Sequence, residues 1–391
     1  MNAALTLTLA VVLTTLTLRH VYRGGTTLND HAVAFVVSGC LWIYPTLWWG
    51  VHQAGLSAAP LFFFGCLFVL GAVSIYGLFY VLDRRRPVAG ALRWVGIFSQ
   101  LAYAFSLWTG LLLVFWVPLA AWTGRPLFWP GLWLMIPVVL AVWGCAWTWL
   151  RHDTLRTHLL AESSDVQPVR VVQLSDLHAS PLMTGSDFNA LVRRVNALSP
   201  DLVVITGDFV MPFSEENHQY LIDAIDRIEA PTLGCLGNHD LPIRTQLCEE
   251  FDAIGKPLLV DERRILTLRG RSVEVVGLDF RWRGAKAATF AALSALPQVD
   301  ADVRVLLVHD PRYFRWIPSE RFDLVLSGHT HGGQVGTNMF GVPWSVLRGL
   351  GLYDQGFFER DSCRLYVHSG NWHTGLPPRM GIAAEIAVFT L

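Results

Sequence analysis

The stretch VRVVQLSDLH, residues 169–178, combines a short β-rich run with two potential metal ligands at its end. Val and Leu at this density are typical of a buried strand. Residues i and i+2 of an extended chain point to the same side, so Asp176 and His178 can bind one metal ion. The stretch therefore predicts a strand that ends in a metal site.

The same arrangement returns at four later points, where a short strand-like run ends in polar residues. Amphipathic stretches lie between these runs, and strands that alternate with helices predict an α/β domain. Ligands bind outside the carboxyl ends of the strands in such sheets, so we expect the polar segments to converge on one crevice. The four later segments are Gly207-Asp208, Gly237-Asn238-His239-Asp240, His309 and GHTHGGQ from Gly328 to Gln334. The predicted strands cover 169–175, 202–206, 231–236, 303–308, 323–327, 364–369 and 383–390, with a hairpin at 264–277, and the predicted helices cover 186–198, 216–229, 242–254 and 286–295.

The candidate ligands offer carboxylate, imidazole and amide oxygen atoms and no thiolate. This set suits Mn, Fe, Zn or Mg and does not choose among them. The groups are more numerous than the roughly four to six ligands of one ion, whereas two divalent ions that share a carboxylate would use them all. The candidates are Asp176, His178, Asp208, Asn238, His309, His329 and His331.

Taken in order, the motifs D-x-H, G-D, G-N-H-D, a lone His and G-H-T-H resemble the calcineurin-like metallophosphoesterase superfamily over roughly residues 168–391. The GHTHGGQ form, with Leu376-Pro377-Pro378-Arg379 and Glu385-Ile386 near the end, is similar to the membrane-anchored subfamily, which includes bacterial lipid-A-pathway pyrophosphatases. The resemblance implies a four-layer αββα sandwich around a two-metal site. It also implies hydrolysis of a phosphoric ester.

Carried over motif by motif, the resemblance implies a role for each site residue. Asp176, His178, Asp208 and His331 would hold the first ion, and Asp208, Asn238, His309 and His329 would hold the second, with Asp208 as the bridge. His239 would stand beside the leaving group, with Asp240 as its orienting partner.

Two arginines are further candidates for substrate binding. A guanidinium group matches the geometry of a phosphate, so Arg348 and Arg379 could bind a second phosphate or a sugar phosphate of the substrate. A surface salt bridge is the alternative for each.

Residues 1–150 have a different composition from the rest of the chain. They hold seven Arg, no Lys and two Asp, and the remaining 23 Lys+Arg and 29 Asp+Glu lie in residues 151–391. With 52% apolar residues and a net charge of −1, the chain is neither disordered nor a basic nucleic-acid binder. Five apolar runs are long enough to cross a bilayer, which takes about 20 helical residues. They cover 2–18, 32–52, 60–82, 94–118 and 127–150.

The predicted fold class is thus a multi-span α-helical membrane domain followed by an α/β metallophosphoesterase domain. The predicted domains are a transmembrane domain of about five helices at 1–150, a linker at 151–168 and the metallophosphoesterase domain at 169–391.

The arginine distribution predicts the orientation. Eight arginines fall on one side of a five-span topology and only Arg125 on the other, so the positive-inside rule places the catalytic domain in the cytoplasm of a cell with the chain in its inner membrane. The eight are Arg19, Arg23, Arg84, Arg85, Arg86, Arg93, Arg151 and Arg156.

The sequence therefore predicts a membrane-anchored, dinuclear-metal phosphoesterase. The expected substrate is a phosphodiester or pyrophosphate in a lipid-linked or nucleotide-sugar-lipid molecule such as UDP-2,3-diacylglucosamine, with the lipid bilayer as a further partner. The apolar segment 339–358 is either a lip for acyl chains or plain packing. Two alternatives are a tethered phosphatase for soluble or protein substrates, and a membrane scaffold or transport subunit with a regulatory phosphoesterase domain.

Overall fold

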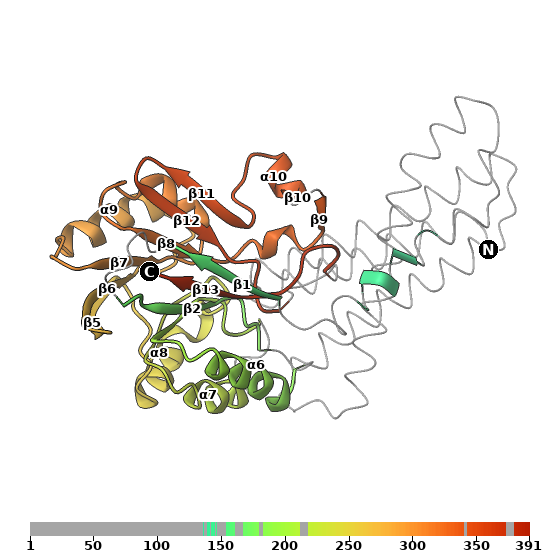
Figure 1. Ribbon diagram of the computed structural model, residues 1–391, viewed down its shortest axis with the longest axis horizontal. Coiled ribbons are helices and arrows are strands. Elements are labelled where there is room, and N and C mark those ends of the chain that lie inside the picture. The colour runs from blue at the N-terminus through green and yellow to red at the C-terminus, as the bar shows by residue number, and fades with distance from the viewer. Residues whose placement is uncertain are drawn as a thin grey trace, which may run out of the picture. The chain divides into compact units, whose positions relative to one another are not determined.

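The computed structural model describes residues 154–160, 167–179, 183–211, 218–339, 342–372 and 379–391, and a few helical residues between 136 and 146. These residues form two β-sheets with helices beside them (Figure 1).

The first sheet has five strands, and β13 runs antiparallel to β2 while the other neighbouring pairs are parallel. Its order is β1 (Thr154–Leu159), β13 (Glu385–Thr390), β2 (Arg170–Leu174), β3 (Leu202–Thr206) and β4 (Thr232–Cys235).

The second sheet has six strands, with a parallel centre and an antiparallel pair at each edge. Its order is β11 (Gly356–Arg360), β12 (Cys363–Val367), β8 (Leu324–Ser327), β7 (Val303–Leu307), β6 (Arg271–Gly277) and β5 (Glu262–Leu268). A separate hairpin of β9 (Gly336–Met339) and β10 (Val342–Ser345) precedes the short helix α10 (Val346–Gly349).

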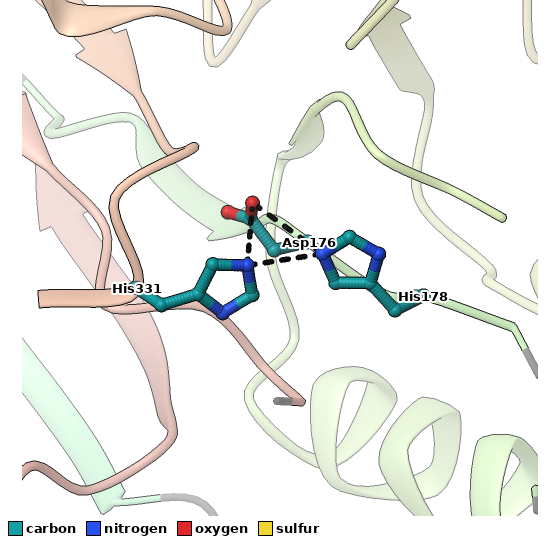
Figure 2. Close-up of side chains that lie close together, drawn as sticks. All are labelled: Asp176, His178 and His331. Atoms are coloured by element: carbon teal, nitrogen blue, oxygen red, sulfur yellow. Dashed lines mark hydrogen bonds and ion pairs between the residues drawn. The ribbon is translucent and has the colours of Figure 1, made fainter. Parts of the chain in front are cut away.

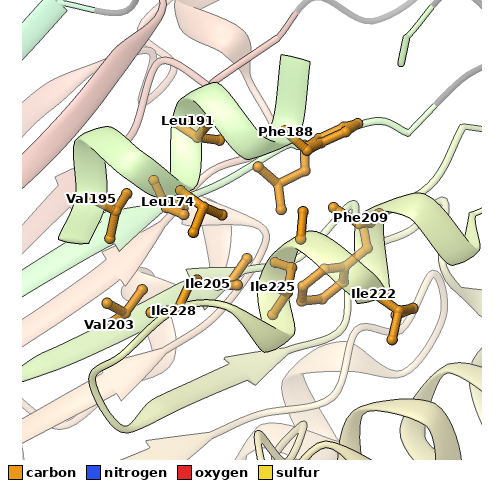
Figure 3. Packing of buried hydrophobic residues seen from close by; sticks show 14 of the residues in the cluster. Leu174, Phe188, Leu191, Val195, Val203, Ile205, Phe209, Ile222, Ile225 and Ile228 are labelled. Atoms are coloured by element: carbon orange, nitrogen blue, oxygen red, sulfur yellow. The ribbon is translucent and has the colours of Figure 1, made fainter. Parts of the chain in front are cut away.

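Side chains of the strands alternate between two cores. On β3, Leu202 and Val204 point into a core shared with the second sheet, whereas Val203 and Ile205 point into the core shared with the helices (Figure 3). The first sheet is therefore covered on both faces, which explains why both faces of its strand β3 carry buried apolar side chains.

Three helices complete the helix-side core of the first sheet. In α6 (Gly185–Ala197), Phe188, Leu191, Val192 and Val195 are buried, a spacing that places them on one helical face (Figure 3). The helices α7 (Gln219–Asp226) and α8 (Arg244–Ala253) supply the rest of that core.

The outer face of the second sheet packs against α9 (Ala285–Ala295) and the 3-10 turn η2 (Pro311–Trp316). The layers are helices, sheet, sheet and helices.

The predicted fold class needs a correction. The structure shows an α/β domain, and no helix in the described part of the chain has the length and apolar character to cross a membrane. The multi-span helical membrane domain is therefore not part of the fold that the structure shows. Four of the five predicted spans, and most of the fifth at 127–150, lie outside the described residues.

Strand β1 lies in the stretch that the sequence predicted to be a linker. Its sequence, TLRTHL, places Arg156 and His158 toward the protein, so the apolar alternation that marks a half-buried strand is missing. The strand is held by parallel pairing with β13 and by burial of those two polar side chains.

The apolar segment 339–358, predicted to be either a lip for acyl chains or plain packing, contains both partly buried and exposed side chains. The Phe357 ring packs edge-on against Tyr366 and Phe389 and is partly buried against the core between the sheets. Trp344, Leu350 and Leu352 are exposed by 49%, 69% and 39%. Among the described residues of the segment, these three apolar side chains are the exposed ones.

The carboxyl ends of five parallel strands position the site. Asp176 and His178 follow β2, Asp208 follows β3, Asn238 follows β4, and the two strands β7 and β8 lead into His309 and His329. Both sheets thus contribute ligands at one edge of the sandwich.

Candidate metal centre

The first candidate metal site consists of Asp176, His178 and His331, which are all buried (Figure 2). The Nε2 atoms of His178 and His331 lie 3.0 Å apart. Oδ1 of Asp176 lies 3.2 Å from Nε2 of His331 and 3.9 Å from Nε2 of His178. Segments that follow β2 and β8 thus bring three ligand atoms around one point.

The second candidate site contains Asp208, Asn238, His309 and His329. Nε2 of His309 lies 3.1 Å from Oδ2 of Asp208 and 3.2 Å from Oδ1 of Asn238. It also lies 3.2 Å from Nδ1 of His329. The four side chains therefore surround a second point.

Asp208 belongs to both sites. Its Oδ2 atom, 3.1 Å from His309, is also 3.7 Å from Nε2 of His178 in the first site. One carboxylate oxygen thus faces ligands of both groups, as a carboxylate shared by two ions requires.

The backbone at the site is unusual. Asp176, His178, Asp208, His329 and His331 all have positive φ angles, of 56°, 43°, 55°, 72° and 49°. A non-glycine residue in this region costs about 1–3 kcal/mol, and such residues concentrate at functional sites. The strained turns after the strands aim these side chains at the same small volume.

Two glycines make the close approach of the loops possible. A Cβ atom at Gly237 would collide with the Asp208 side chain, and one at Gly328 would collide with Ser175 and Asp176. Any larger residue would displace a candidate ligand, so both positions require glycine.

The position of the ring hydrogen in each histidine shows whether its other nitrogen is free to bind a metal ion. Nδ1 of His331 lies 3.0 Å from the Trp372 carbonyl, and Nδ1 of His309 lies 2.7 Å from the Thr206 carbonyl. A carbonyl only accepts, so each Nδ1 carries the hydrogen and, in the neutral ring, Nε2 carries a lone pair. These lone pairs face the oxygens of Asp176 and Asp208. Lone pairs that converge in this way fit cations, and the carbonyls are the supporting partners usual for metal-binding histidines.

Burial and neighbouring charges shift the pKa values of the histidines in the site. Burial lowers the pKa of His178 well below its usual value, and burial and the neighbouring His309 lower the pKa of His329 to about 4. Burial would also lower the pKa of His309, but the carboxylates of Asp208 and Asp176 outweigh it and raise that pKa to about 10. A proton between His309 and Asp208 therefore competes with a metal ion for the second site.

His239 and Asp240 differ in their surroundings. Nε2 of His239 lies 3.8 Å from Oδ2 of Asp208, and its side chain is 16% exposed. The buried Asp240 carboxylate accepts hydrogen bonds from the backbone N–H groups of Gly237, Asp208 and Phe209, at 2.8–2.9 Å. Its described bonds thus hold the two ligand loops together, and none of them goes to His239, the partner that the sequence predicted.

The two candidate arginines bond to the protein itself. Nε of Arg348 donates to Asp354 at 2.8 Å and Nη2 donates to the Gln355 carbonyl at 2.6 Å. Arg379 is 3% exposed, and its Nη2 donates to carbonyls of the loop 369–372. The structure therefore places Arg348 beside the site motif and Arg379 behind His331.

Residues outside the predicted set also support the site. The buried Asn371 accepts from the Ser175 N–H at 2.9 Å and donates to the Glu385 carbonyl at 2.7 Å. Phe280 packs its ring 5.9 Å from His309 and 6.1 Å from His329. The Asn371 amide bonds to backbone groups and Phe280 has no ligand atom, so a search for ligand motifs does not select either residue. The position of Phe280 just after a parallel strand, β6, was the available signal.

Comparisons with known proteins agree with this site. A model of the calcineurin-like phosphoesterase family matches residues 169–333. The chain is 31% identical over 248 residues to the uncharacterized metallophosphoesterase YkuE of Bacillus subtilis, covering 61% of this chain and 84% of that protein. It is 28% identical over 201 residues to phosphodiesterase YaeI of Escherichia coli, covering 50% and 72%. It is 30% identical over 313 residues to the UDP-2,3-diacylglucosamine pyrophosphatase LpxG of Chlamydia trachomatis, covering 61% and 91%. The chain therefore belongs to the calcineurin-like phosphoesterases, metal-dependent phosphoric ester hydrolases with a dinuclear metal site.

Proposed function

We propose that this phosphoric ester hydrolase cleaves a phosphodiester or pyrophosphate bond in a lipid-linked or nucleotide-sugar-lipid substrate. The observation that carries the proposal is the position of Asp208, whose Oδ2 atom faces His309 of one candidate site and His178 of the other. A pair of ions bridged in this way suits a phosphoryl group with an attacking and a leaving oxygen.

The residues of the chain have distinct tasks in this reaction. When bound, the two ions supply Lewis acidity toward the phosphoryl oxygens and activate water. We assign the first ion to Asp176, His178, Asp208 and His331 and the second to Asp208, Asn238, His309 and His329. His239 stands beside Asp208 with part of its ring exposed. Burial lowers the pKa of His239, so its imidazolium is a stronger acid toward a departing oxygen while a smaller fraction of the ring is protonated at neutral pH.

The lipid part of the proposal rests on the segment that follows His331. Ser345 and Leu347 lie against Gly333 of the GHTHGGQ motif, and Thr330 donates a hydrogen bond to the Asp354 carbonyl. The exposed side chains of Trp344, Leu350 and Leu352 belong to this segment. Acyl chains that contact them could gain about 0.8 kcal/mol for each buried methylene group. The likeness to the pyrophosphatase LpxG favours the same substrate class.

The first test compares an acylated sugar-nucleotide pyrophosphate with its deacylated analogue. We expect the full-length, metal-loaded enzyme to hydrolyse the acylated compound with a kcat/KM at least about tenfold higher, the equivalent of roughly two buried methylene groups. Replacement of Trp344, Leu350 and Leu352 with Ser should bring this ratio close to one.

A matched control is Ile265→Ser, which removes an exposed apolar side chain from the edge strand β5 and should keep the ratio. Equal turnover of both compounds by the unmodified enzyme would overturn the lipid proposal. That result would favour a phosphatase for soluble or protein substrates.

The cytoplasmic location of the catalytic domain stays a prediction that the arginine distribution supports. A fluorescent reporter fused after Leu391 should be active, and an exported phosphatase fused at the same point should be inactive. The opposite pair of results would contradict the prediction.

A further inference from the structure

The loop 278–284 borders the metal centre although it holds no candidate ligand. It connects β6 to α9 and leaves β6 at its carboxyl end, next to the carboxyl end of the parallel neighbour β7 that leads into His309. Loops at this edge of an open α/β sheet form the walls of the substrate crevice. The loop is therefore in a position to contact a substrate whose phosphate lies at the ions.

An aromatic pair connects the metal centre to the surface of this loop. Phe280 is 3% exposed and lies against His309 and His329. The Trp282 ring meets it edge-on at 4.9 Å between centroids, with an angle of 84° between the planes. Trp282 itself is 56% exposed. An indole is thus displayed to solvent one ring away from two candidate ligands.

The backbone that leads into Trp282 is held by ion pairs and hydrogen bonds of the residues before it. Asp279 is buried and pairs with Arg244 at 2.8 Å. Arg281 pairs with Asp261 at 2.5 Å and its N–H donates to the Tyr313 hydroxyl at 2.9 Å. A rigid aromatic face loses little conformational entropy when a ligand stacks on it.

The surroundings of Trp282 are polar, in contrast to the segment 344–352. Its neighbours in the chain are Arg281 and the exposed Arg283, followed by the exposed Gly284. An acyl chain gains from a continuous apolar area, which this loop does not offer. A planar ring with polar edges gains from stacking on an exposed aromatic face.

We propose that Trp282 is the stacking platform for the nucleobase of the substrate. The inference rests on the proposed function, because it assumes a nucleotide as part of the substrate. In a 5′-nucleotide the ribose separates the base from the phosphate. In the protein the Phe280 ring separates Trp282 from the imidazoles of His309 and His329 at the metal centre. The base stacks on the indole, while the phosphate takes its place at the metal centre.

The experiment measures competitive inhibition constants of uridine 5′-monophosphate and ribose 5-phosphate on the metal-loaded enzyme. Methyl p-nitrophenyl phosphate serves as the reporter substrate. The two inhibitors share sugar and phosphate, so the ratio of their constants reports the base alone. We expect uridine 5′-monophosphate to bind about tenfold more tightly to the unmodified enzyme, and Trp282→Ala to reduce this ratio to near one. Trp282→Phe should keep most of it.

The matched control is Phe290→Ala, which removes an aromatic side chain of similar exposure, 46%, from the following helix α9 and should keep the full ratio. Equal inhibition of the unmodified enzyme by both compounds, or an unchanged ratio in Trp282→Ala, would overturn the proposal. A change in the acylated-to-deacylated ratio in Trp282→Ala, with the inhibitor ratio intact, would also overturn it and assign the indole to acyl chains. The proposed lipid substrate is judged separately, by the acylated-to-deacylated ratio of the unmodified enzyme.

Discussion

At the scale of single residues, Asp208 is the side chain on which both candidate ions depend. Asp208→Asn removes a negative charge that faces ligands of both sites, at 3.1 Å from His309 and 3.7 Å from His178. We expect this variant to lose turnover entirely and to hold less metal than the unmodified protein. Elemental analysis of the purified variant, together with an assay of phosphodiester hydrolysis, measures both effects.

His239→Ala is the companion of that experiment, because His239 is assigned to proton transfer and not to metal binding. Loss of a general acid lowers turnover by about 10²–10⁴-fold. The variant should retain its metal content. Metal loss in His239→Ala would show that the ring ligates an ion and would contradict the assignment.

Arg379 illustrates how a buried cation can position a ligand. Its Nη2 and the Nδ1–H of His331 both donate to the Trp372 carbonyl. Arg379→Gln should loosen this carbonyl and weaken metal binding at the first site by about 10–100-fold, the usual cost of a lost supporting contact. Titration of the metal-free protein with Mn²⁺ measures the affinity. An unchanged affinity with a raised KM would instead indicate that Arg379 binds the substrate.

At the scale of elements, strand β1 is tied to the site by one ion pair. Nε of Arg156 lies 2.6 Å from Oε2 of the buried Glu385, whose Oε1 accepts from the N–H of Ser369 in the loop that carries Trp372. Arg156→Met leaves a buried carboxylate without its cation. Since Arg156 is 29% exposed and water can replace part of the pair, we expect a loss of about 2–3 kcal/mol in the free energy of unfolding.

Urea unfolding measures this loss, and the double variant Arg156→Met with Glu385→Gln is its control. Removal of both charges should recover part of the stability, because no unpaired ion remains in the interior. A double variant less stable than Arg156→Met would show that Glu385 stabilises the loop through its other bonds alone.

At the scale of the whole molecule, the imidazoles of the site contribute to the pH dependence of stability in the metal-free protein, and Asp240, whose pKa burial raises to about 7, opposes the histidines with lowered pKa values below that pH. The pKa of His329 is lowered to about 4 and that of His178 is also lowered, so below pH 6.5 the unfolded chain binds protons that the folded chain does not. Stability should therefore fall as the pH drops from about 6.5 to 4, by about 1.4 kcal/mol per pH unit for each such proton. The pKa of His309 is raised to about 10. Its contribution to the free energy of unfolding is therefore complete below pH 6.5 and is lost as the pH rises toward 10.

These two opposite trends predict a stability maximum of the chelated protein near pH 6.5, which urea unfolding at pH 4.5, 6.5 and 8.5 would test. Divalent ions should raise the free energy of unfolding by about 2.7 kcal/mol per site at an ion concentration one hundred times the dissociation constant. Because an ion must displace the proton of His309, we expect the affinity of the second site to rise with pH between 6.5 and 9. An affinity independent of pH would argue against His309 as a ligand.

Local chemistry in the sequence was enough to predict the central strands of both sheets, the longer helices and the ligand-type residues of the catalytic domain. The predicted strand at 202–206 and the predicted hairpin at 264–277 agree with β3 and with the pair β5–β6, because apolar runs and Gly270 carry their signal locally. The order of the five ligand motifs likewise identified the side chains that lie close together at one edge of the sandwich. The multi-span membrane domain was predicted from the apolar runs and the low charge of residues 1–150, and the described fold contains no such domain.

Only the tertiary structure decided which side chains face each other. Strand β1 has polar inward residues, so its place became visible only through pairing with β13 and the contact of Arg156 with Glu385, which is 229 residues away. The sequence could not separate Phe357, which packs against the core between the sheets, from Leu350, which is exposed. Nor could it separate an Arg379 that binds phosphate from one that binds backbone carbonyls. Burial and partner choice depend on segments far apart in the chain, whereas residue type and periodicity are local, and this is the physical reason for the division.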